Sequence, residues 1–288
     1  MCCWMRFICS LAWFAAMSAG QETVSETTQA STPSLATTMS AMKSTSFQPR
    51  YPYIVSIGEN VKGYYKHLCV GVILSNEFVL SAAHCIKMMP IKQLYVSGGA
   101  DTLNSRKQDR FFVVEKRFHP QFKVLGGHDI AVLRVYPKFQ LDDVRFRSIN
   151  FTRKLRRGSG IKASLVGWGR VGVGKIKKLR EMPFLTMEND ECQRSHRFVF
   201  LKPLDICAMH LKGSKGPCDG DSGAPLMNVA KEMLYGLLSY GRKACTPLKP
   251  YAFTRISGYS GWIQESMDYM VARLQIIKIN RTVWKDRF

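Results

Sequence analysis

Ser222 is the residue of this chain whose surroundings best suit a nucleophile. It lies in the run 218–225, which reads CDGDSGAP and places a glycine on either side of it, at Gly220 and Gly223. Glycine lets the backbone approach a substrate carbonyl with no Cβ in the way. The amides of Gly220 and Ser222 can then point at one oxygen and stabilise the negative charge that develops on it. The run alone also fits an ordinary turn of small residues, so its chemistry depends on partners elsewhere.

Two other segments supply the groups that would activate a serine hydroxyl. His84 lies in the run SAAHC at 81–85, directly after an apolar segment, and Asp129 precedes the apolar run 130–133. A serine becomes a good nucleophile when a base takes its proton, and the base works best when an acid fixes its tautomer. An aspartate at the head of a buried strand must find hydrogen-bond donors, and histidine is one. The three residues together therefore predict a set of nucleophile, base and acid.

The segments that must position these residues have sequence patterns typical of β-strands. From Tyr51 onward, short β-branched and apolar runs alternate with glycine and charge, a pattern typical of an all-β sandwich or barrel. Apolar residues between Trp262 and Leu274 recur at helical spacing and predict a terminal helix packed on the β-structure. The predicted strands are 53–57, 68–74, 78–81, 93–96, 111–114, 130–135, 163–166 and 234–239.

With these motifs the chain resembles the chymotrypsin/trypsin family of serine endopeptidases over about residues 51–270. The resemblance implies two six-stranded antiparallel β-barrels with the active site between them, followed by a C-terminal α-helix. It implies peptide-bond hydrolysis through an acyl-enzyme without a cofactor or metal. Ser222 would be the nucleophile, His84 the general base and acid, Asp129 its orienting carboxylate, and the amides of Gly220 and Ser222 the oxyanion hole. Besides these residues, the resemblance rests on PYIVS at 52–56, FHPQF at 118–122, VGWG at 166–169 and SYG at 239–241.

The resemblance also assigns a substrate-binding set. Ser239 would support Asp129 and begin the segment 239–241, along which a substrate peptide would add as a β-strand. The implied substrate-binding residues are Gly216, Asp219, Ser239, Tyr240, Gly241 and Tyr251.

The nine cysteines indicate an oxidising compartment. Cys2, Cys3 and Cys9 fall in an expected signal segment, and the remaining six form an even set. Six cysteines allow fifteen pairings, and metal ligation is a competing reading, although no Cys-x-x-Cys pair occurs after residue 20. The family resemblance implies the disulfides Cys69–Cys85, Cys192–Cys207 and Cys218–Cys245.

The activation region departs from the family's pattern. Relatives are cut ahead of an Ile-Val-Gly-Gly-like start, and residues 39–45 offer none. In relatives the new terminal ammonium pairs with the aspartate matching Asp221. Here we expect Asp221 to be solvated, protonated or paired with another cation, such as Lys215 or a rerouted N-terminus. Arg50 is a candidate processing site, but Tyr51 lies too near the predicted barrel to reach that pocket.

Two further departures concern the substrate pocket and the nucleophile turn. Gly216 stands where trypsin-like members carry the acid that binds Lys or Arg, and Tyr251 stands where open-pocket members carry glycine. The phenol ring is expected to fill the pocket unless local gaps shift it outward, so a small substrate residue or no productive binding is predicted. Ala224 replaces a glycine and adds a methyl group behind Ser222, which the turn must tolerate or tilt to accept.

The flanking regions predict a secreted glycoprotein. Arg6 precedes an apolar stretch too short to span a membrane, so we expect a signal peptide at 1–20 rather than a membrane anchor. A Ser/Thr-rich disordered linker or pro-region at 21–49, the protease domain at 50–270 and a basic C-terminal extension at 271–288 complete the predicted organisation. Asn150 and Asn280 begin glycosylation sequons.

The charge balance bears on partners. The chain carries 42 Lys and Arg against 21 Asp and Glu, a formal net charge of +21, with basic clusters at 153–157 and 175–178. Such a field attracts polyanions such as sulfated glycans or acidic glycoproteins, unless it serves only as a solvated surface. No aromatic interleaving indicates specific nucleic-acid recognition, and we expect a monomer with no membrane span. Two functions remain open: a secreted endopeptidase, or a catalytically weak homologue that binds acidic partners.

Overall fold

The computed structural model describes residues 49–104, 106–151, 159–175, 177–195, 201–213, 215–241 and 245–285, with side chains up to residue 275. The expected signal peptide and nearly all of the Ser/Thr-rich segment lie outside these residues, as does the basic cluster 153–157.

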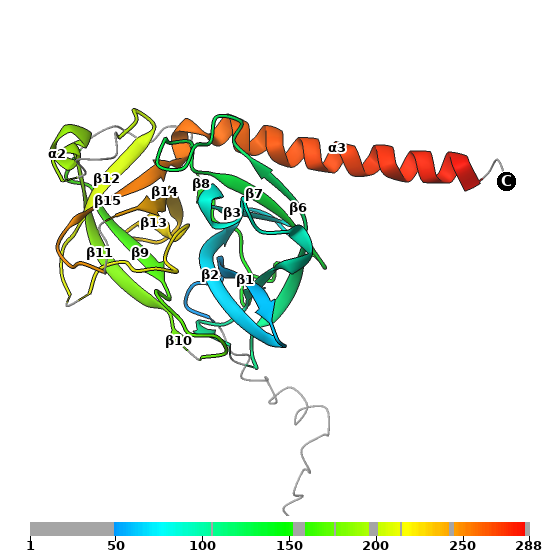
Figure 1. Ribbon diagram of the computed structural model, residues 1–288, viewed down its shortest axis with the longest axis horizontal. Helices are drawn as coiled ribbons and strands as arrows, with labels where there is room; N and C mark the ends of the chain where they lie inside the picture. The colour runs from blue at the N-terminus through cyan, green and yellow to red at the C-terminus, as the bar shows by residue number, and fades with distance from the viewer. Residues whose placement is uncertain are drawn as a thin grey trace, which may run out of the picture. The chain divides into compact units, whose positions relative to one another are not determined.

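The first half of the described chain closes into a six-stranded antiparallel barrel (Figure 1). Its strands pair in the order β1-β2-β3-β7-β6-β4, and β4 returns to β1. The interior is filled by β-branched and aromatic side chains such as Ile57, Val79 and Phe111, the residue types that pack best on a pleated surface. The strands are β1 (Ile54–Val61), β2 (Tyr64–Ile73), β3 (Phe78–Ser81), β4 (Leu94–Gly98), β6 (Asp109–Phe118) and β7 (Ala131–Tyr136).

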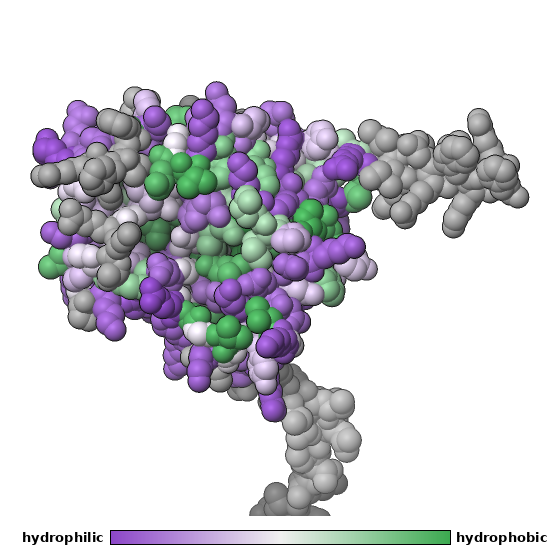
Figure 2. Space-filling model, viewed as in Figure 1, coloured by the Kyte–Doolittle hydropathy of each residue, from purple (hydrophilic) through white to green (hydrophobic). Residues whose placement is uncertain are grey.

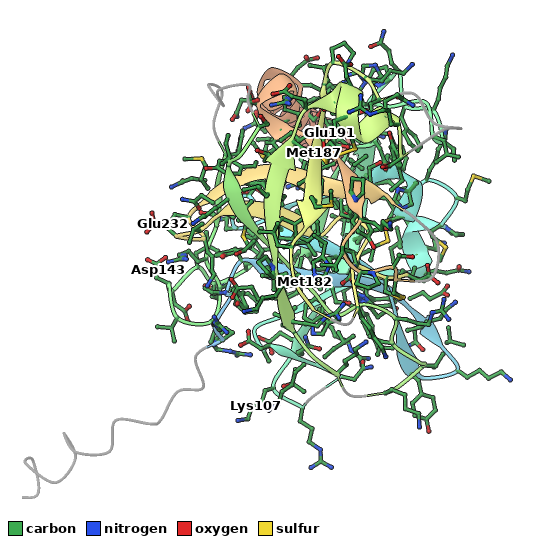
Figure 3. The ribbon with its side chains drawn as sticks, turned by 90° about the vertical axis from the view of Figure 1, so that its left-hand side faces the viewer. Lys107, Asp143, Met182, Met187, Glu191 and Glu232 are labelled. Carbon is green, nitrogen blue, oxygen red and sulfur yellow. A yellow bond between two sulfur atoms is a disulfide. The ribbon has the colours of Figure 1, made fainter. Side chains whose placement is uncertain are left out.

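The second half forms another closed six-stranded antiparallel barrel, in the order β13-β9-β11-β12-β15-β14 and back to β13. Met182 and Met187, labelled in Figure 3, mark two points along β11, where buried and half-buried positions alternate. Alternation of this kind places one face of a strand in the core. The strands are β9 (Lys162–Gly167), β11 (Arg180–Met187), β12 (Asp205–His210), β13 (Pro225–Asn228), β14 (Met233–Tyr240) and β15 (Pro250–Arg255). The expected all-β class with two six-stranded barrels is thus confirmed.

Short elements connect and flank the barrels. β5 (Thr102–Leu103) pairs with β10 (Lys177–Lys178), β8 (Asn150–Phe151) adds in parallel to β14, and the helix α2 spans Asn189–Gln193.

The expected terminal helix is present as α3 (Ser260–Lys285), which runs past β7 and β6 in Figure 1. Arg134 of β7 donates to the carbonyl of Met270 at 3.3 Å, and Arg273 forms a 3.2 Å ion pair with Glu115 of β6. Ile263 and Met270 are fully buried, so the first half of the helix is packed on the barrels. The helix continues without a break through residue 270.

The surface is mainly polar. Figure 2 shows hydrophilic residues over most of the viewed face, with hydrophobic residues gathered in small patches between them. Among the described residues, no helix combines the length and the apolar character needed to cross a membrane.

Candidate active site

His84 and Asp129 are brought together by the pairing of β3 with β7. Ser81, at the end of β3, lies opposite Ala131, at the start of β7. His84 follows in the 3-10 turn Ala83–Cys85, and Asp129 lies two residues ahead of Ala131. The same edge of the first barrel therefore carries both side chains. Nδ1 of His84 lies 2.6 Å from Oδ2 of Asp129.

Asp129 is a buried carboxylate with three donors. The backbone N–H of His84 donates to Oδ1 at 2.9 Å, and Ser239 Oγ donates to Oδ2 at 2.5 Å, where His84 Nδ1 also binds. Only 8% of the aspartate side chain is exposed, so these bonds replace its lost hydration. Since a carboxylate only accepts, Nδ1 of neutral His84 carries the proton and Nε2 presents a lone pair. In that form Nε2 of His84 can accept a proton.

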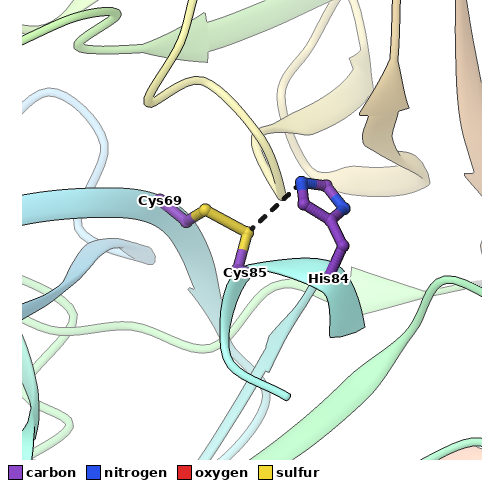
Figure 4. Close-up of side chains that lie close together, drawn as sticks. All are labelled: Cys69, His84 and Cys85. Atoms are coloured by element: carbon purple, nitrogen blue, oxygen red, sulfur yellow. Dashed lines mark hydrogen bonds between the residues drawn. A yellow bond between two sulfur atoms is a disulfide. The ribbon is translucent and has the colours of Figure 1, made fainter. Parts of the chain in front are cut away.

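The lone pair of His84 faces a disulfide in this structure. Nε2 lies 3.8 Å from Cys85 Sγ, and Cys85 is bonded to Cys69 (Figure 4). Within the described part of the chain, the contact of Nε2 is thus with Cys85 and not with Ser222. The two sulfurs and His84 lie within 4.8 Å of one another, but sulfurs joined in a disulfide are not the thiolates that metals bind.

Ser222 stands on a turn that is bonded to both barrels. Its carbonyl accepts from Val70 N of β2 at 2.9 Å, while Gly223 N donates to Leu238 O of β14 at 2.8 Å. Gly223 has φ +77°, and a Cβ there would overlap Val70 O and Ser81 Oγ. Glycine is therefore required next to the serine by the backbone itself.

Ala224, where the family has glycine, fits without disturbing this turn. It is fully buried, its N–H donates to Asp221 O at 2.9 Å, and its carbonyl accepts from Leu238 N at 2.9 Å.

The amides of Gly220 and Ser222 are open to a ligand. Among the described residues, neither donates to a protein acceptor. Gly220 has φ +93°, and a Cβ there would lie 2.5 Å from Gly169 O. These two amides therefore remain candidates for the predicted oxyanion hole.

A buried histidine fixes the carbonyl of Gly220. His67 Nε2 donates to Gly220 O at 2.9 Å, so Nδ1 of the neutral ring accepts from Ser56 Oγ at 2.7 Å. The Ser56 hydroxyl then accepts from Tyr65 Oη at 2.8 Å. Because the Gly220 carbonyl can only accept, it fixes the direction of all three hydrogen bonds. Burial lowers the pKa of His67 to about 4, which keeps the ring neutral.

Asp221, directly before Ser222, is completely buried. Gly169 N donates to Oδ1 at 2.6 Å and Cys218 N donates to Oδ2 at 2.9 Å. Oδ2 also lies 4.0 Å from the guanidinium of Arg180, on β11. Burial raises the pKa of Asp221, while the two N–H groups and the Arg180 charge oppose that rise. Of the expected environments, contact with bulk solvent is excluded by burial, the raised pKa favours the protonated form, and the cation at ion-pair distance is Arg180 rather than Lys215.

Tyr251 fills the pocket beside Ser222. It lies on β15, is 2% exposed, and its hydroxyl donates to Thr246 O at 2.7 Å. A Cβ at Gly216 would lie 2.6 Å from Tyr251 Oη, and a Cβ at Gly241 would overlap the ring. The two glycines therefore make room for this ring. Burial, helped by the Asp221 carboxylate, raises the pKa of Tyr251 to about 12, so the phenol is neutral.

The space that remains is a pocket of about 180 Å³, lined by Ser222, Ser239, Tyr240, Gly241 and Tyr251 among others. Asp219 also lines it but is exposed and forms an ion pair with Arg170.

Comparisons with known proteins identify the family of this chain. The Trypsin family matches residues 42–263. The chain belongs to the trypsin family. It is 31% identical to granzyme M of Rattus norvegicus over 74% of this chain and 83% of that protein. It is 29% identical to mast cell protease 3 of Ovis aries over 75% of this chain and 84% of that protein.

A solved structure shares the fold of this trypsin-family chain. The scabies mite inactivated protease paralogue S-I1 superposes with a TM-score of 0.64 at 23% identity, covering 76% of this chain and 95% of that one. At this identity the likeness concerns the fold alone.

In this member of the trypsin family the three disulfides are those that the resemblance implies: Cys69–Cys85, Cys192–Cys207 and Cys218–Cys245. Asn150 is exposed on β8, as a glycan acceptor must be, while the Asn280 side chain lies outside the described residues.

Sequence reasoning missed two residues of this site, Arg180 and His67. Arg180 follows the basic cluster 175–178, a pattern typical of exposed residues. Nothing in its spacing indicates a contact with Asp221, 41 positions later in the sequence. His67 precedes Cys69 by two positions in a strand, and a lone histidine in a strand carries no signal of a distant carbonyl partner.

Proposed function

We propose that this chain is a secreted serine endopeptidase that forms an acyl-enzyme and admits only small side chains to its specificity pocket. The observation that carries the proposal is the 2.6 Å contact between His84 Nδ1 and Asp129, with Ser239 as a further donor to the same carboxylate. An orienting acid of this kind has its main use when the other ring nitrogen must accept a proton. Three disulfides support an oxidising, extracellular setting.

The proposed reaction begins with Ser222. Its Oγ attacks the carbonyl carbon of the scissile bond while His84 Nε2 takes the hydroxyl proton and Asp129 stabilises the resulting imidazolium. The amides of Gly220 and Ser222 bind the carbonyl oxygen as it becomes negative. His84 then gives the proton to the departing amine and the acyl-enzyme remains. A water molecule attacks the acyl-enzyme, His84 takes the water's proton, and the acid product leaves as the proton returns to Ser222 Oγ.

The proposal requires the imidazole to move from Cys85 toward Ser222. Catalytic hydrogen bonds commonly tighten only when substrate is bound, and Nδ1 can stay on Asp129 while Nε2 swings. Residues 239–241 would hold the substrate main chain as an added β-strand, with Asp219 at the rim of the pocket. Because Gly216 carries no charge and Tyr251 occupies the slot, Lys and Arg are not expected at the cleavage site.

A second candidate is a protease-fold binding protein with weak or no turnover. It is favoured by one observation, the ring of Tyr251 in the pocket. The net charge of +21 would then serve to bind sulfated glycans or acidic glycoproteins.

A fluorophosphonate probe separates the two candidates. The purified protein should be labelled at Ser222, and Ser222→Ala should abolish the labelling. Absence of labelling in the folded protein would overturn the endopeptidase proposal. A peptide library in which Lys or Arg wins would contradict the pocket assignment. Retention on heparin well above physiological salt would favour the binding protein's polyanion site over a diffuse field.

A further inference from the structure

Asp221, directly before Ser222, lies within ion-pair distance of an arginine of the second barrel. Asp221 has no exposed surface, and its oxygens receive two backbone N–H bonds, from Gly169 and Cys218. Burial raises the pKa of Asp221, and a positive charge nearby offsets part of the cost of keeping the carboxylate ionised. The described residue that supplies a charge within ion-pair distance is Arg180, at 4.0 Å.

The same guanidinium also binds the segment that leads to the nucleophile. Arg180 Nη1 donates to Lys215 O at 3.2 Å and Nη2 donates to Gly216 O at 3.1 Å. One side chain therefore contacts the main chain at 215–216 and the side chain of Asp221. A guanidinium suits this task because its donors are held in a fixed plane.

A second cation lies nearby. Lys177 Nζ and Asp221 Oδ2 are both 3.4 Å from the point that a Cβ of Gly169 would occupy. Lys177 Nζ donates to Arg170 O at 2.8 Å. It therefore adds positive charge near Asp221 without a hydrogen bond to the Asp221 side chain. The amino-terminal end of the described chain is committed elsewhere: Arg50 N donates to Asp101 at 2.9 Å, and Tyr51 Oη donates to Glu181 at 2.5 Å.

We propose that Arg180 is the positioning residue that keeps Asp221 and the segment 215–222 ordered, so that the oxyanion amides are in place without a newly cut amino terminus. The inference rests on the proposed function for its meaning, because the ordered segment carries Ser222. It concerns the regulation of that site: the uncut chain would have constitutive activity rather than depend on a processing protease.

Hydrogen exchange tests the ordering without requiring activity. In the uncut protein, Arg180→Ala should speed amide exchange of peptides covering 215–222 by about tenfold or more, while first-barrel peptides stay unchanged as an internal reference. Lys215→Ala is the matched control. It removes a positive charge that lines the same pocket, but this side chain is exposed, so the exchange rate of the 215–222 peptides should stay within twofold of wild type. Equal exchange in the two variants would overturn the proposal.

Chemical rescue and a second variant complete the exchange test. The pocket beside Arg180 is open, with a volume of about 730 Å³, so millimolar methylguanidinium should enter the Arg180→Ala protein and slow its exchange again, with no effect on wild type. If Arg180→Ala does not fold, Arg180→Lys replaces it. The lysine ammonium keeps the charge but cannot bind the carbonyls of Lys215 and Gly216 in the same planar geometry. Exchange of the 215–222 peptides should then rise above wild type, but less than expected for the alanine variant. Exchange equal to that of wild type would then overturn the proposal.

Fluorophosphonate labelling distinguishes this inference from the function beneath it. Wild-type labelling that falls about tenfold or more in Arg180→Ala supports both. Wild-type labelling that Arg180→Ala leaves unchanged overturns the inference alone. Absence of wild-type labelling overturns the endopeptidase, while the exchange result still decides the role of Arg180.

Discussion

Acidification should weaken this fold at His67, the buried ring that fixes the Gly220 carbonyl. The ring is 5% exposed, and burial lowers its pKa from 6.5 to about 4. The folded protein therefore binds this proton less readily than the unfolded chain. The corresponding stability is fully present above pH 6.5 and is lost as the pH falls toward 4. A shift of this size corresponds to about 3 kcal/mol in the free energy of unfolding.

Urea unfolding at pH 7 and pH 4, followed by tryptophan fluorescence with the disulfides intact, measures this loss. His67→Gln is the informative variant, because its amide can still donate to Gly220 O but does not titrate. Wild type should lose about 3 kcal/mol more than His67→Gln between the two pH values. Carboxyl groups titrate in both proteins, so their contributions cancel in the difference.

His119→Gln provides the control. This histidine is only half-buried, so its replacement should change the pH dependence much less than His67→Gln does. If wild type and His67→Gln lose the same free energy on acidification, the assignment of a neutral, desolvated ring to His67 is wrong.

Three changes at the site have expected outcomes of their own. Tyr251→Ala should raise kcat/KM for peptides with Phe or Leu at the cleavage site by roughly 10- to 200-fold and lower the free energy of unfolding by about 3–5 kcal/mol, whereas Tyr251→Phe should leave the substrate preference unchanged. A series of peptide substrates measures the preference and urea titration measures the stability. An unchanged preference in the alanine variant would show that the ring does not fill the pocket. Asp129→Asn should offer an N–H to His84 Nδ1, fix the wrong tautomer and lower kcat by about four orders of magnitude, and near-normal turnover would show that another group orients the ring. Gly220→Ala must place a Cβ 2.5 Å from Gly169 O at φ +93°, so fluorophosphonate labelling should slow by about 100-fold or more; labelling within tenfold of wild type would remove this amide from the oxyanion hole.

Strand periodicity is local, so the sequence alone predicted an all-β chain and every strand of the first barrel, while the two-barrel arrangement came from the family resemblance. Each of the eight predicted runs overlaps an observed strand. Four strands of the second barrel were not among the predicted runs: β11, β12, β13 and β15. β11 mixes Arg180, Glu181 and Pro183 with its apolar residues, and β15 begins with Pro250, so neither reads as a continuous β-branched run. Their place is set by pairing partners distant in sequence.

The site shows the same division. Motif residues such as His84 and Ser222 could be named in advance because the chemistry restricts their neighbours in sequence. The contact of Arg180 with Asp221 and that of His67 with Gly220 depend on how the second barrel closes and where β2 lies against it. No local pattern encodes either contact.

The bond from Val70 N to Ser222 O limits how this protein can be recombined with its relatives. Ser222 belongs in sequence to the second barrel, yet β2 of the first barrel holds its carbonyl through Val70 and the carbonyl of Gly220 through His67. The same strand carries Cys69, which is joined to the neighbour of His84. The two barrels are therefore not interchangeable modules. A chimaera that takes its second barrel from a relative also needs that relative's residues at 65–70, because this stretch binds the turn that carries Ser222.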